Sequence, residues 1–206
     1  MQVTPLSIDG AWRIEPEQHS DERGVFLEWF RQDVLARQVG HPLDLQQANW
    51  STSAAGVVRG VHFADLPPSQ AKYVTCVSGA AVDVAVDVRV GSPTYGTWEA
   101  VRLDDENRNA VYLAEGLGHA FMALAPRTTV VYLCSASYAP GREHGINPLD
   151  PGLGIDWPTH GRDGGDLTPA LSPKDQEAPT LVEAEQAGML PTFADAQAFY
   201  SGLRAY

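Results

Sequence analysis

Glycine and proline interrupt this chain so often that only short secondary-structure elements can form between them. The 206 residues include 19 glycines and 15 prolines. The segments between them alternate apolar and other side chains, as half-buried β-strands do. In AAVDVAVDVRV, residues 80–90, the valines at 82, 84, 86 and 88 share one face, and Asp83, Ala85, Asp87 and Arg89 share the other. Short strands with frequent turns predict an all-β protein, an antiparallel sandwich or barrel of jelly-roll type.

A few short helices are expected beside the strands. RQDVLARQVG, residues 31–40, ends at a glycine that suits a helix C-cap. Another short helix is expected in PEQHSDERG, residues 16–24. The segment from about 180 to 206 has the pattern of two closing helices. The length suits one domain over residues 1–206.

The charge balance argues against several classes of function. The formal net charge is −12, whereas a nucleic-acid-binding protein needs a basic face. The same acidity disfavours an anionic membrane surface, and no stretch approaches the roughly 20 apolar residues of a membrane span. The N-terminus lacks a basic and apolar leader, so we expect a cytoplasmic protein. Cys76 and Cys134 lie in apolar runs and are expected to be buried free thiols.

Three cationic or protonatable residues flank one turn near the middle of this acidic chain. Arg59, His62 and Lys72 lie on either side of Leu-Pro-Pro-Ser, residues 66–69. Strand alternation in KYVTCVS places Lys72 on a face that is otherwise apolar, where lysine is unusual. An exposed strand-end lysine that points outward is the alternative. Because His62 is close in sequence, we favour a functional role for Lys72.

Two further residues are candidates for the same site. His119 stands in AEGLGHAFMAL after glycines at 116 and 118, which leave room for a ligand. A packed core histidine is an equally good interpretation. Tyr132 lies in the strand-like run TTVVYLCSASY, and a mid-strand tyrosine usually fills core space. In a barrel lined by His62, Lys72 and His119, its hydroxyl would instead be a proton donor.

No cofactor motif accompanies these residues. A metal-binding cupin usually offers histidines two residues apart, but Gly60 and Ala64 stand at that distance from His62. Three further histidines are scattered in loops. The sequence has no G-x-G-x-x-G that opens a helix, no P-loop and no G-x-S-x-G. We therefore expect no metal and no cofactor.

A histidine, a lysine and a tyrosine without a cofactor suit the removal of a proton next to a carbonyl group. Histidine titrates near neutral pH and can take the proton. The developing enolate oxygen needs a positive charge, which Lys72 can supply. A tyrosine on the other side can return a proton to the opposite face and so invert the carbon. A carboxylate would orient the histidine ring, and Asp175 and Asp83 are both candidates.

Several motifs, in the right order, resemble the dTDP-4-dehydrorhamnose 3,5-epimerase family from about residue 21 to residue 175. They are DERGVFLEWF, QANWSTS, GVVRGVHF, AKYVTCVSGAAVDVAVDVRVGSPTYGTW, VYLAEGLGHAFMAL, YLCSASYAP, GIDWP and LSPKDQEAP. The resemblance implies a cupin-like jelly roll that needs no metal. It also implies epimerisation of dTDP-4-keto-6-deoxyglucose at C3, C5 or both. The tail EAEQAGMLPTFADAQAFY is most similar to the branch that makes sugars for antibiotics.

The resemblance also implies roles for individual residues. His62 corresponds to the catalytic base, Asp175 to its partner carboxylate, Lys72 to the group that stabilises the enolate, and Tyr132 to the general acid. His119 corresponds to a histidine that lines the sugar pocket, and Arg23 and Arg59 correspond to residues that hold the diphosphate. Glu28, Gln47, Asn49 and Tyr138 correspond to residues that contact the thymidine part or line its site.

The resemblance implies a homodimer as well. Family members are homodimers in which an N-terminal strand crosses to the neighbour, so Arg23, Phe26 and Glu28 are expected to serve the other subunit's site. One departure is Trp50, where many members carry a smaller or polar residue; it either reshapes the pocket wall or packs.

Two other functions stay open at this point. A sugar-nucleotide 3,4-ketoisomerase on the same barrel would share a histidine base. A sugar-binding jelly roll without turnover explains the strands, but it does not explain Lys72 in an apolar strand.

Overall fold

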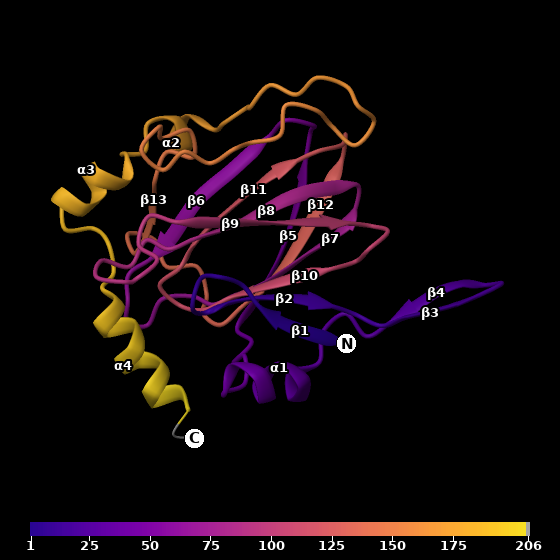
Figure 1. Ribbon diagram of the computed structural model, residues 1–206, viewed down its shortest axis with the longest axis horizontal. Helices are drawn as coiled ribbons and strands as arrows, with labels where there is room; N and C mark the ends of the chain where they lie inside the picture. The colour runs from indigo at the N-terminus through magenta and orange to yellow at the C-terminus, as the bar shows by residue number, and fades with distance from the viewer. Residues whose placement is uncertain (205–206) are drawn as a thin grey trace.

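Two antiparallel β-sheets pack face to face and form the body of the protein (Figure 1). The computed structural model describes residues 1–204. The six-stranded sheet runs in the order β1 (Gln2–Pro5), β2 (Ala11–Glu15), β10 (Ala110–Leu113), β7 (Lys72–Ser78), β12 (Thr128–Cys134) and β5 (Gln47–Ser53). The five-stranded sheet runs in the order β13 (Glu143–Gly145), β6 (Val58–Ala64), β11 (Gly118–Ala123), β8 (Ala80–Val86) and β9 (Trp98–Asp104). The predicted all-β jelly roll is confirmed, although the ladders within residues 1–204 do not join the two sheets into a closed barrel.

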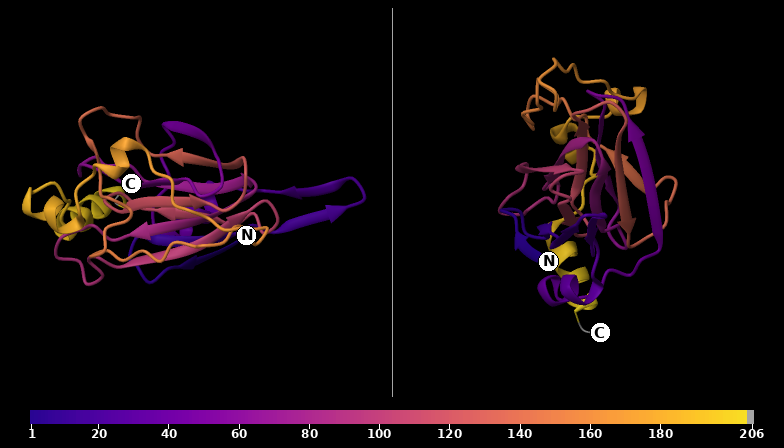
Figure 2. Two further views of the ribbon diagram at one scale, coloured as in Figure 1. Left: turned by 90° about the horizontal axis from the view of Figure 1, so that it is seen from above. Right: turned by 90° about the vertical axis from the view of Figure 1, so that its right-hand side faces the viewer.

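A hairpin projects from one end of this body. It consists of β3 (Gln18–Asp21) and β4 (Gly24–Leu27), which pair only with each other among the described strands (Figure 2). The helix expected at 16–24 is therefore wrong. The Asp21 carboxylate accepts a hydrogen bond from the backbone N–H of Arg23 at 2.8 Å, and Gly24 has a φ of +131°. This local turn competes with the helix and reverses the chain instead.

Four helices are found in residues 1–204: α1 (Gln32–Val39), α2 (Pro173–Gln176), α3 (Leu181–Gln186) and α4 (Phe193–Leu203). The expected helix at 31–40 is confirmed. Gly40 ends it with a φ of +94°, and its backbone N–H donates a hydrogen bond to the Ala36 carbonyl. The two closing helices are confirmed as α3 and α4, whereas α2 lies in a segment that showed no helical pattern. No helix among the described residues is long and apolar enough to cross a membrane.

Strand alternation distributes the side chains between the inside and the outside of the two sheets. Val74 and Cys76 of β7 pack in the core between the sheets, against Ala85 of β8. Tyr132 is directly opposite Val74, and Lys72 is directly opposite Cys134. Lys72 and Tyr132 therefore project from the six-stranded sheet toward the five-stranded sheet, as the alternation predicts.

The outer faces of the two sheets are covered unequally. The C-terminal segment covers the five-stranded sheet, where Trp157 and Leu181 pack on the valine face of β8. Helices α1 and α4 cover the part of the six-stranded sheet around β2 and β10, where Val39 and Tyr200 are buried. The part along β12 and β5 is left open, and the Trp50 side chain there is 71% exposed.

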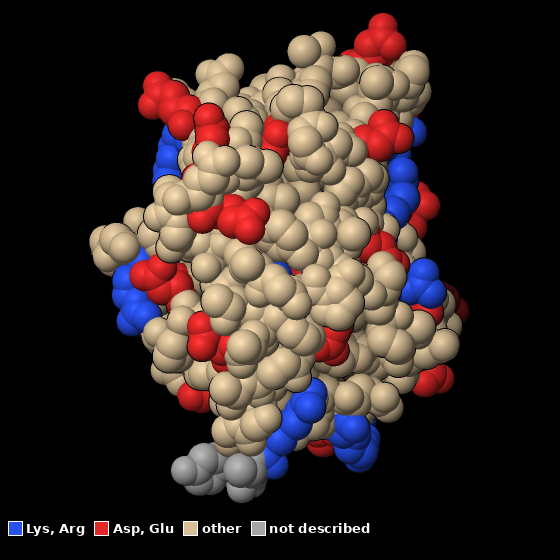
Figure 3. Space-filling model, turned by 60° about the vertical axis from the view of Figure 1, so that its left-hand side comes forward, with Lys and Arg blue, Asp and Glu red and all other residues tan. Residues whose placement is uncertain are grey.

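The surface reflects the acidic composition. Asp and Glu side chains are spread over the side that carries α3 and α4, and Lys and Arg form no continuous area on that face (Figure 3). Cys76 and Cys134 are buried and free, as expected.

Candidate active site

A cavity of about 400 Å³ between the two sheets gathers most of the predicted reactive groups. This volume suits a small-molecule ligand. Its lining residues are Trp50, Ser51, Thr52, Arg59, His62, Lys72, His119, Phe121 and Tyr132. Five of the predicted site residues are thus brought together from four strands, β6, β7, β11 and β12. His62 and His119 come from the five-stranded sheet, and Lys72 and Tyr132 come from the six-stranded sheet.

A β-bulge places Arg59 and His62 in the same cavity. Three residues apart in a regular strand, they would point to opposite faces. On the partner strand, however, His62 pairs with His119 and Arg59 pairs with Phe121, so β6 has one extra residue. Gly60 makes this possible: it has a φ of +116°, and a Cβ on it would lie 2.4 Å from the His119 carbonyl oxygen.

His62 is hydrogen-bonded to Asp175, which settles which carboxylate contacts its ring. The His62 Nε2 lies 2.7 Å from Asp175 Oδ1, and the Ser172 hydroxyl donates to Asp175 Oδ2 at 2.8 Å. Burial alone would raise the pKa of Asp175, but the hydrogen bonds from His62 and Ser172 lower it overall. An ionised carboxylate can only accept, so Nε2 carries the hydrogen and the Nδ1 lone pair is free.

His119 has a carboxylate partner of its own. Its Nε2 lies 2.7 Å from Asp83 Oδ2, and both side chains are buried. Asp83 Oδ1 is buried and has no hydrogen-bond partner among the described residues. Asp83, the second candidate to orient His62, therefore serves His119. The His119 and Tyr132 rings lie 6.5 Å apart, so this pair borders the cavity opposite the tyrosine.

Burial changes the acidity of the two groups that come from the six-stranded sheet. It lowers the pKa of the Lys72 ammonium, and the neighbouring Cys134, Glu143 and Asp83 oppose that effect. It raises the pKa of the Tyr132 phenol, so the hydroxyl keeps its proton at neutral pH. The cavity thus combines a free imidazole lone pair, an amine and a protonated phenol.

A second cavity of about 340 Å³ adjoins the first and shares Arg59 and His62 with it. Its other lining residues include Ser172, Lys174 and Asp175 of the loop and helix around α2. The Arg59 Nε donates to Ser53 Oγ at 3.1 Å. Sequence reasoning missed Lys174 as a second cation here, although it stands next to Asp175 in LSPKDQEAP. It also missed Ser51, whose buried hydroxyl has no partner within residues 1–204.

Gln47, Asn49 and Tyr138 form one hydrogen-bonded chain at the end of β5. The Gln47 amide donates to Asn49 Oδ1 at 2.8 Å and accepts from the backbone N–H of Tyr138 at 2.8 Å. The Asn49 amide in turn donates to Cys134 Sγ at 3.5 Å. Asn49 is directly opposite Tyr132 and lines a groove on the outer face of the six-stranded sheet, whereas Gln47, Asn49 and Tyr138 are not among the residues that line the main cavity.

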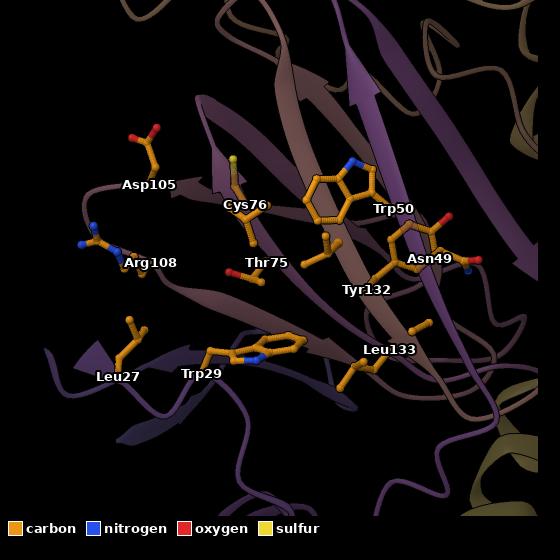
Figure 4. A pocket seen from close by; sticks show the side chains of 13 residues that line it. Leu27, Trp29, Asn49, Trp50, Thr75, Cys76, Asp105, Arg108, Tyr132 and Leu133 are labelled. Carbon is orange, nitrogen blue, oxygen red and sulfur yellow. The ribbon is translucent and has the colours of Figure 1, made fainter. Parts of the chain in front are cut away.

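Arg23, Phe26 and Glu28 do not line the cavity of their own chain. Arg23 and Phe26 lie on the projecting hairpin, where Arg23 pairs with Asp21 and the Phe26 side chain is 67% exposed. Glu28 pairs with Arg31 just after the hairpin. Trp50 lines both the main cavity and a groove on the outer face of the six-stranded sheet (Figure 4). Its Nε1 donates to Thr52 Oγ1 at 3.2 Å.

No group of three His, Cys, Asp or Glu side chains converges as metal ligands within residues 1–204. His62 and His119 are each hydrogen-bonded to a carboxylate instead. The arrangement is that of two His–Asp pairs beside an amine and a phenol, which suits proton transfer.

Comparison with known proteins also points to epimerases that act on dTDP-linked sugars. The model of the family described as dTDP-4-dehydrorhamnose 3,5-epimerase matches residues 5–183. The dTDP-4-dehydrorhamnose 3-epimerase of Streptomyces niveus is 58% identical over 198 residues, which cover 96% of this chain and 92% of that protein.

Two solved structures superpose over nearly the whole chain. The Mycobacterium tuberculosis rmlC epimerase does so with a TM-score of 0.94 at 50% identity, over 99% of this chain and 100% of that one. ChmJ, a 3'-monoepimerase from Streptomyces bikiniensis in complex with dTDP-quinovose, has a TM-score of 0.93 at 50% identity, over 98% of this chain and 100% of that one.

Proposed function

This chain belongs to the dTDP-4-dehydrorhamnose 3,5-epimerase family, and we propose that it inverts C3, C5 or both in a dTDP-linked 4-keto-6-deoxyhexose such as dTDP-4-keto-6-deoxyglucose. One observation carries this proposal. His62 and Tyr132 enter the same cavity from two facing sheets. A hexose between them presents one ring face to an imidazole and the other to a phenol, as inversion requires.

His62 is the base in this proposal. Its Nε2–H is held by Asp175, so the Nδ1 lone pair takes the proton from the carbon next to the C4 ketone. The C–H electron pair forms an enolate, and the proton leaves on the imidazole. Asp175 stabilises the imidazolium that results.

Lys72 and Tyr132 complete the reaction. The developing negative charge on O4 is stabilised by the Lys72 ammonium, whose burial between the sheets strengthens the electrostatic interaction. Tyr132 then donates its proton to the same carbon from the opposite face, and the C–H bond forms again with inverted configuration. The phenolate regains a proton from the solvent, and His62 releases its proton there.

Positive charge beside the cavity suits the diphosphate of the substrate. Arg59 lies in both cavities, and Lys174 lines the adjoining one. Arginine can bind two phosphate oxygens at once, and lysine adds a point charge. In this proposal the hydrogen-bonded chain of Gln47, Asn49 and Tyr138 contacts the thymidine part, as the family resemblance implies.

A homodimer explains two exposed features together. The groove of about 540 Å³ on the outer face of the six-stranded sheet is lined by Trp29, Trp50, Leu133 and other mostly apolar residues (Figure 4). The hairpin exposes Phe26 beside it. A second copy seated on this face would cover both and bring its Arg23 toward this chain's cavity. Light scattering of Trp50→Asp should then show a monomer where the native chain is a dimer.

Product NMR tests the reaction directly. With dTDP-4-keto-6-deoxyglucose, the product should keep its ketone at C4 and show inverted hydrogens at C3, C5 or both. A ketone that moves to C3 would indicate the ketoisomerase instead. Substrate that binds and is recovered unchanged would indicate a binding jelly roll.

A further inference from the structure

The C-terminal helix α4 reaches the loop that leads to His119. This helix lies beyond residues 5–183, which the family model matches. The Tyr200 side chain is buried, and its hydroxyl donates a hydrogen bond to the backbone carbonyl of Glu115. Glu115 belongs to the short connection between β10 and β11, and β11 begins at residue 118 with His119 as its second residue.

The same connection is held at several other points. The backbone N–H of Ala114 donates to Gly10 at 2.8 Å, and that of Gly116 donates to Ser69 Oγ at 3.0 Å. The Ser135 hydroxyl donates to the Glu115 carboxylate at 2.8 Å. These contacts hold residues 114 and 116 and the Glu115 side chain, whereas Tyr200 holds the Glu115 carbonyl. Loss of that bond therefore shifts residue 115, and the densely packed interior passes the shift to His119.

Tyr200 also belongs to a buried polar cluster at the end of the strand that carries Asp83. The Arg89 guanidinium is fully buried; it donates to Asp87 Oδ1 at 2.8 Å and to the Tyr200 hydroxyl at 3.5 Å. Its side chain packs against Gly116, where an added Cβ would lie 3.4 Å from Arg89 Cδ. The cluster therefore contacts both the connection before His119 and the chain after Asp83.

We propose that Tyr200 is a positioning residue: through its hydroxyl, helix α4 fixes the connection before His119 and thereby sets the His119–Asp83 pair at the edge of the cavity. This inference rests on the proposed function, because it assigns His119 a place beside the substrate. The pair is held by one 2.7 Å hydrogen bond, whose strength depends on the position of the ring.

Tyr200→Phe tests the proposal because it removes one hydroxyl and leaves the ring. Thr192→Ala is the matched control: it removes the N-cap of the same helix, where Thr192 accepts from the Asp195 N–H at 3.0 Å, and it does not touch residue 115. The readouts are the ring-nitrogen NMR signals of His119 without substrate, the thermal midpoint, kcat and KM. A misplacement of 1 Å can slow a reaction about 100-fold, so a smaller shift should lower kcat about tenfold.

The proposal requires that Tyr200→Phe moves the His119 signals and lowers kcat, while Thr192→Ala lowers the thermal midpoint and leaves both unchanged. If both variants behave alike, or if neither moves His119, Tyr200 only anchors the helix and the proposal is overturned. If Tyr200→Phe does not fold, 4-fluorophenylalanine at position 200 fills the space of the hydroxyl without donating. Because the NMR arm needs no turnover, it stands or falls separately from the proposed reaction.

Discussion

Replacing Asp175 by asparagine should inactivate the protein through the tautomer of His62. Asp175 accepts from His62 Nε2 with one oxygen and from the Ser172 hydroxyl with the other. In Asp175→Asn, the Ser172 hydroxyl retains its acceptor only if the amide oxygen turns toward it. The amide NH₂ then faces His62 Nε2 and donates to it, so the ring hydrogen moves to Nδ1 and the lone pair that should act as base is lost.

The expected size of the effect follows from these contacts. Loss of a hydrogen bond to a charged group is worth about 1.5–3 kcal/mol, which is roughly 10-fold to 150-fold in rate. The loss of rate in Asp175→Ala should lie in that range, because water can replace the carboxylate and His62 can still adopt the tautomer with its hydrogen on Nε2. Asp175→Asn should lose roughly 10³-fold to 10⁴-fold, since a wrong tautomer has that effect in a comparable His–Asp pair.

The assay is kcat measured by product NMR for four variants. Asp175→Asn should be slower than Asp175→Ala, and adding Ser172→Ala to Asp175→Asn should recover activity, because the amide can then present its oxygen to His62. Ser172→Ala alone is the control for the lost N-cap of α2. The tautomer argument is wrong if Asp175→Asn has the same kcat as the native chain. It is also wrong if Ser172→Ala lowers kcat by the same factor in Asp175→Asn as in the native chain.

Three further perturbations follow from the geometry. Gly60→Ala puts a Cβ 2.4 Å from the His119 carbonyl oxygen, so the bulge must shift. Turnover should disappear, and calorimetry should show a large loss of stability. Unchanged turnover and stability would disprove the role of the bulge. Tyr132→Phe should still exchange the substrate C–H with solvent but should form little inverted product; full inversion would assign the acid elsewhere. Burial alone would raise the pKa of Asp87, but hydrogen bonds from Arg89, Ser92 and Thr94 lower it overall. Its contribution to stability is therefore present above about pH 4 and is lost as the pH falls further. Asp87→Asn should lower the free energy of unfolding by about 3–5 kcal/mol at neutral pH, because it leaves Arg89 unpaired. The difference between the variant and the native chain should shrink in acid, and a difference independent of pH would contradict the pairing.

Strand alternation was sufficient to predict part of the site. It placed Lys72 and Tyr132 on the inside of the six-stranded sheet, because each shares a face with residues of the core. It could not place Arg59 and His62 together, because regular alternation puts residues three apart on opposite faces. The signal was Gly60 between them, whose positive φ and close approach to β11 create the bulge.

Contacts between distant segments were beyond the sequence pattern. Asp175 and Asp83 were equal candidates for His62, because nothing local distinguishes a carboxylate 113 residues away from one 21 residues away. The structure decides through α2, where the Ser172 cap turns Asp175 toward His62. The two interpretations of Trp50 were equally open: Trp50 is opposite Val131, is largely exposed, and lines both the main cavity and the groove on the outer face, so it forms part of the pocket wall and does not pack in the core.

Deuterium exchange with carbon-by-carbon NMR tests the central claim most directly, that a His62–Asp175 base makes the C–H bond next to the C4 ketone labile. In D₂O, dTDP-4-keto-6-deoxyglucose should gain deuterium at C3, C5 or both with the native chain, and at neither carbon with His62→Ala. Substrate that binds the native chain without gaining deuterium, or that gains it equally with His62→Ala, would contradict the account.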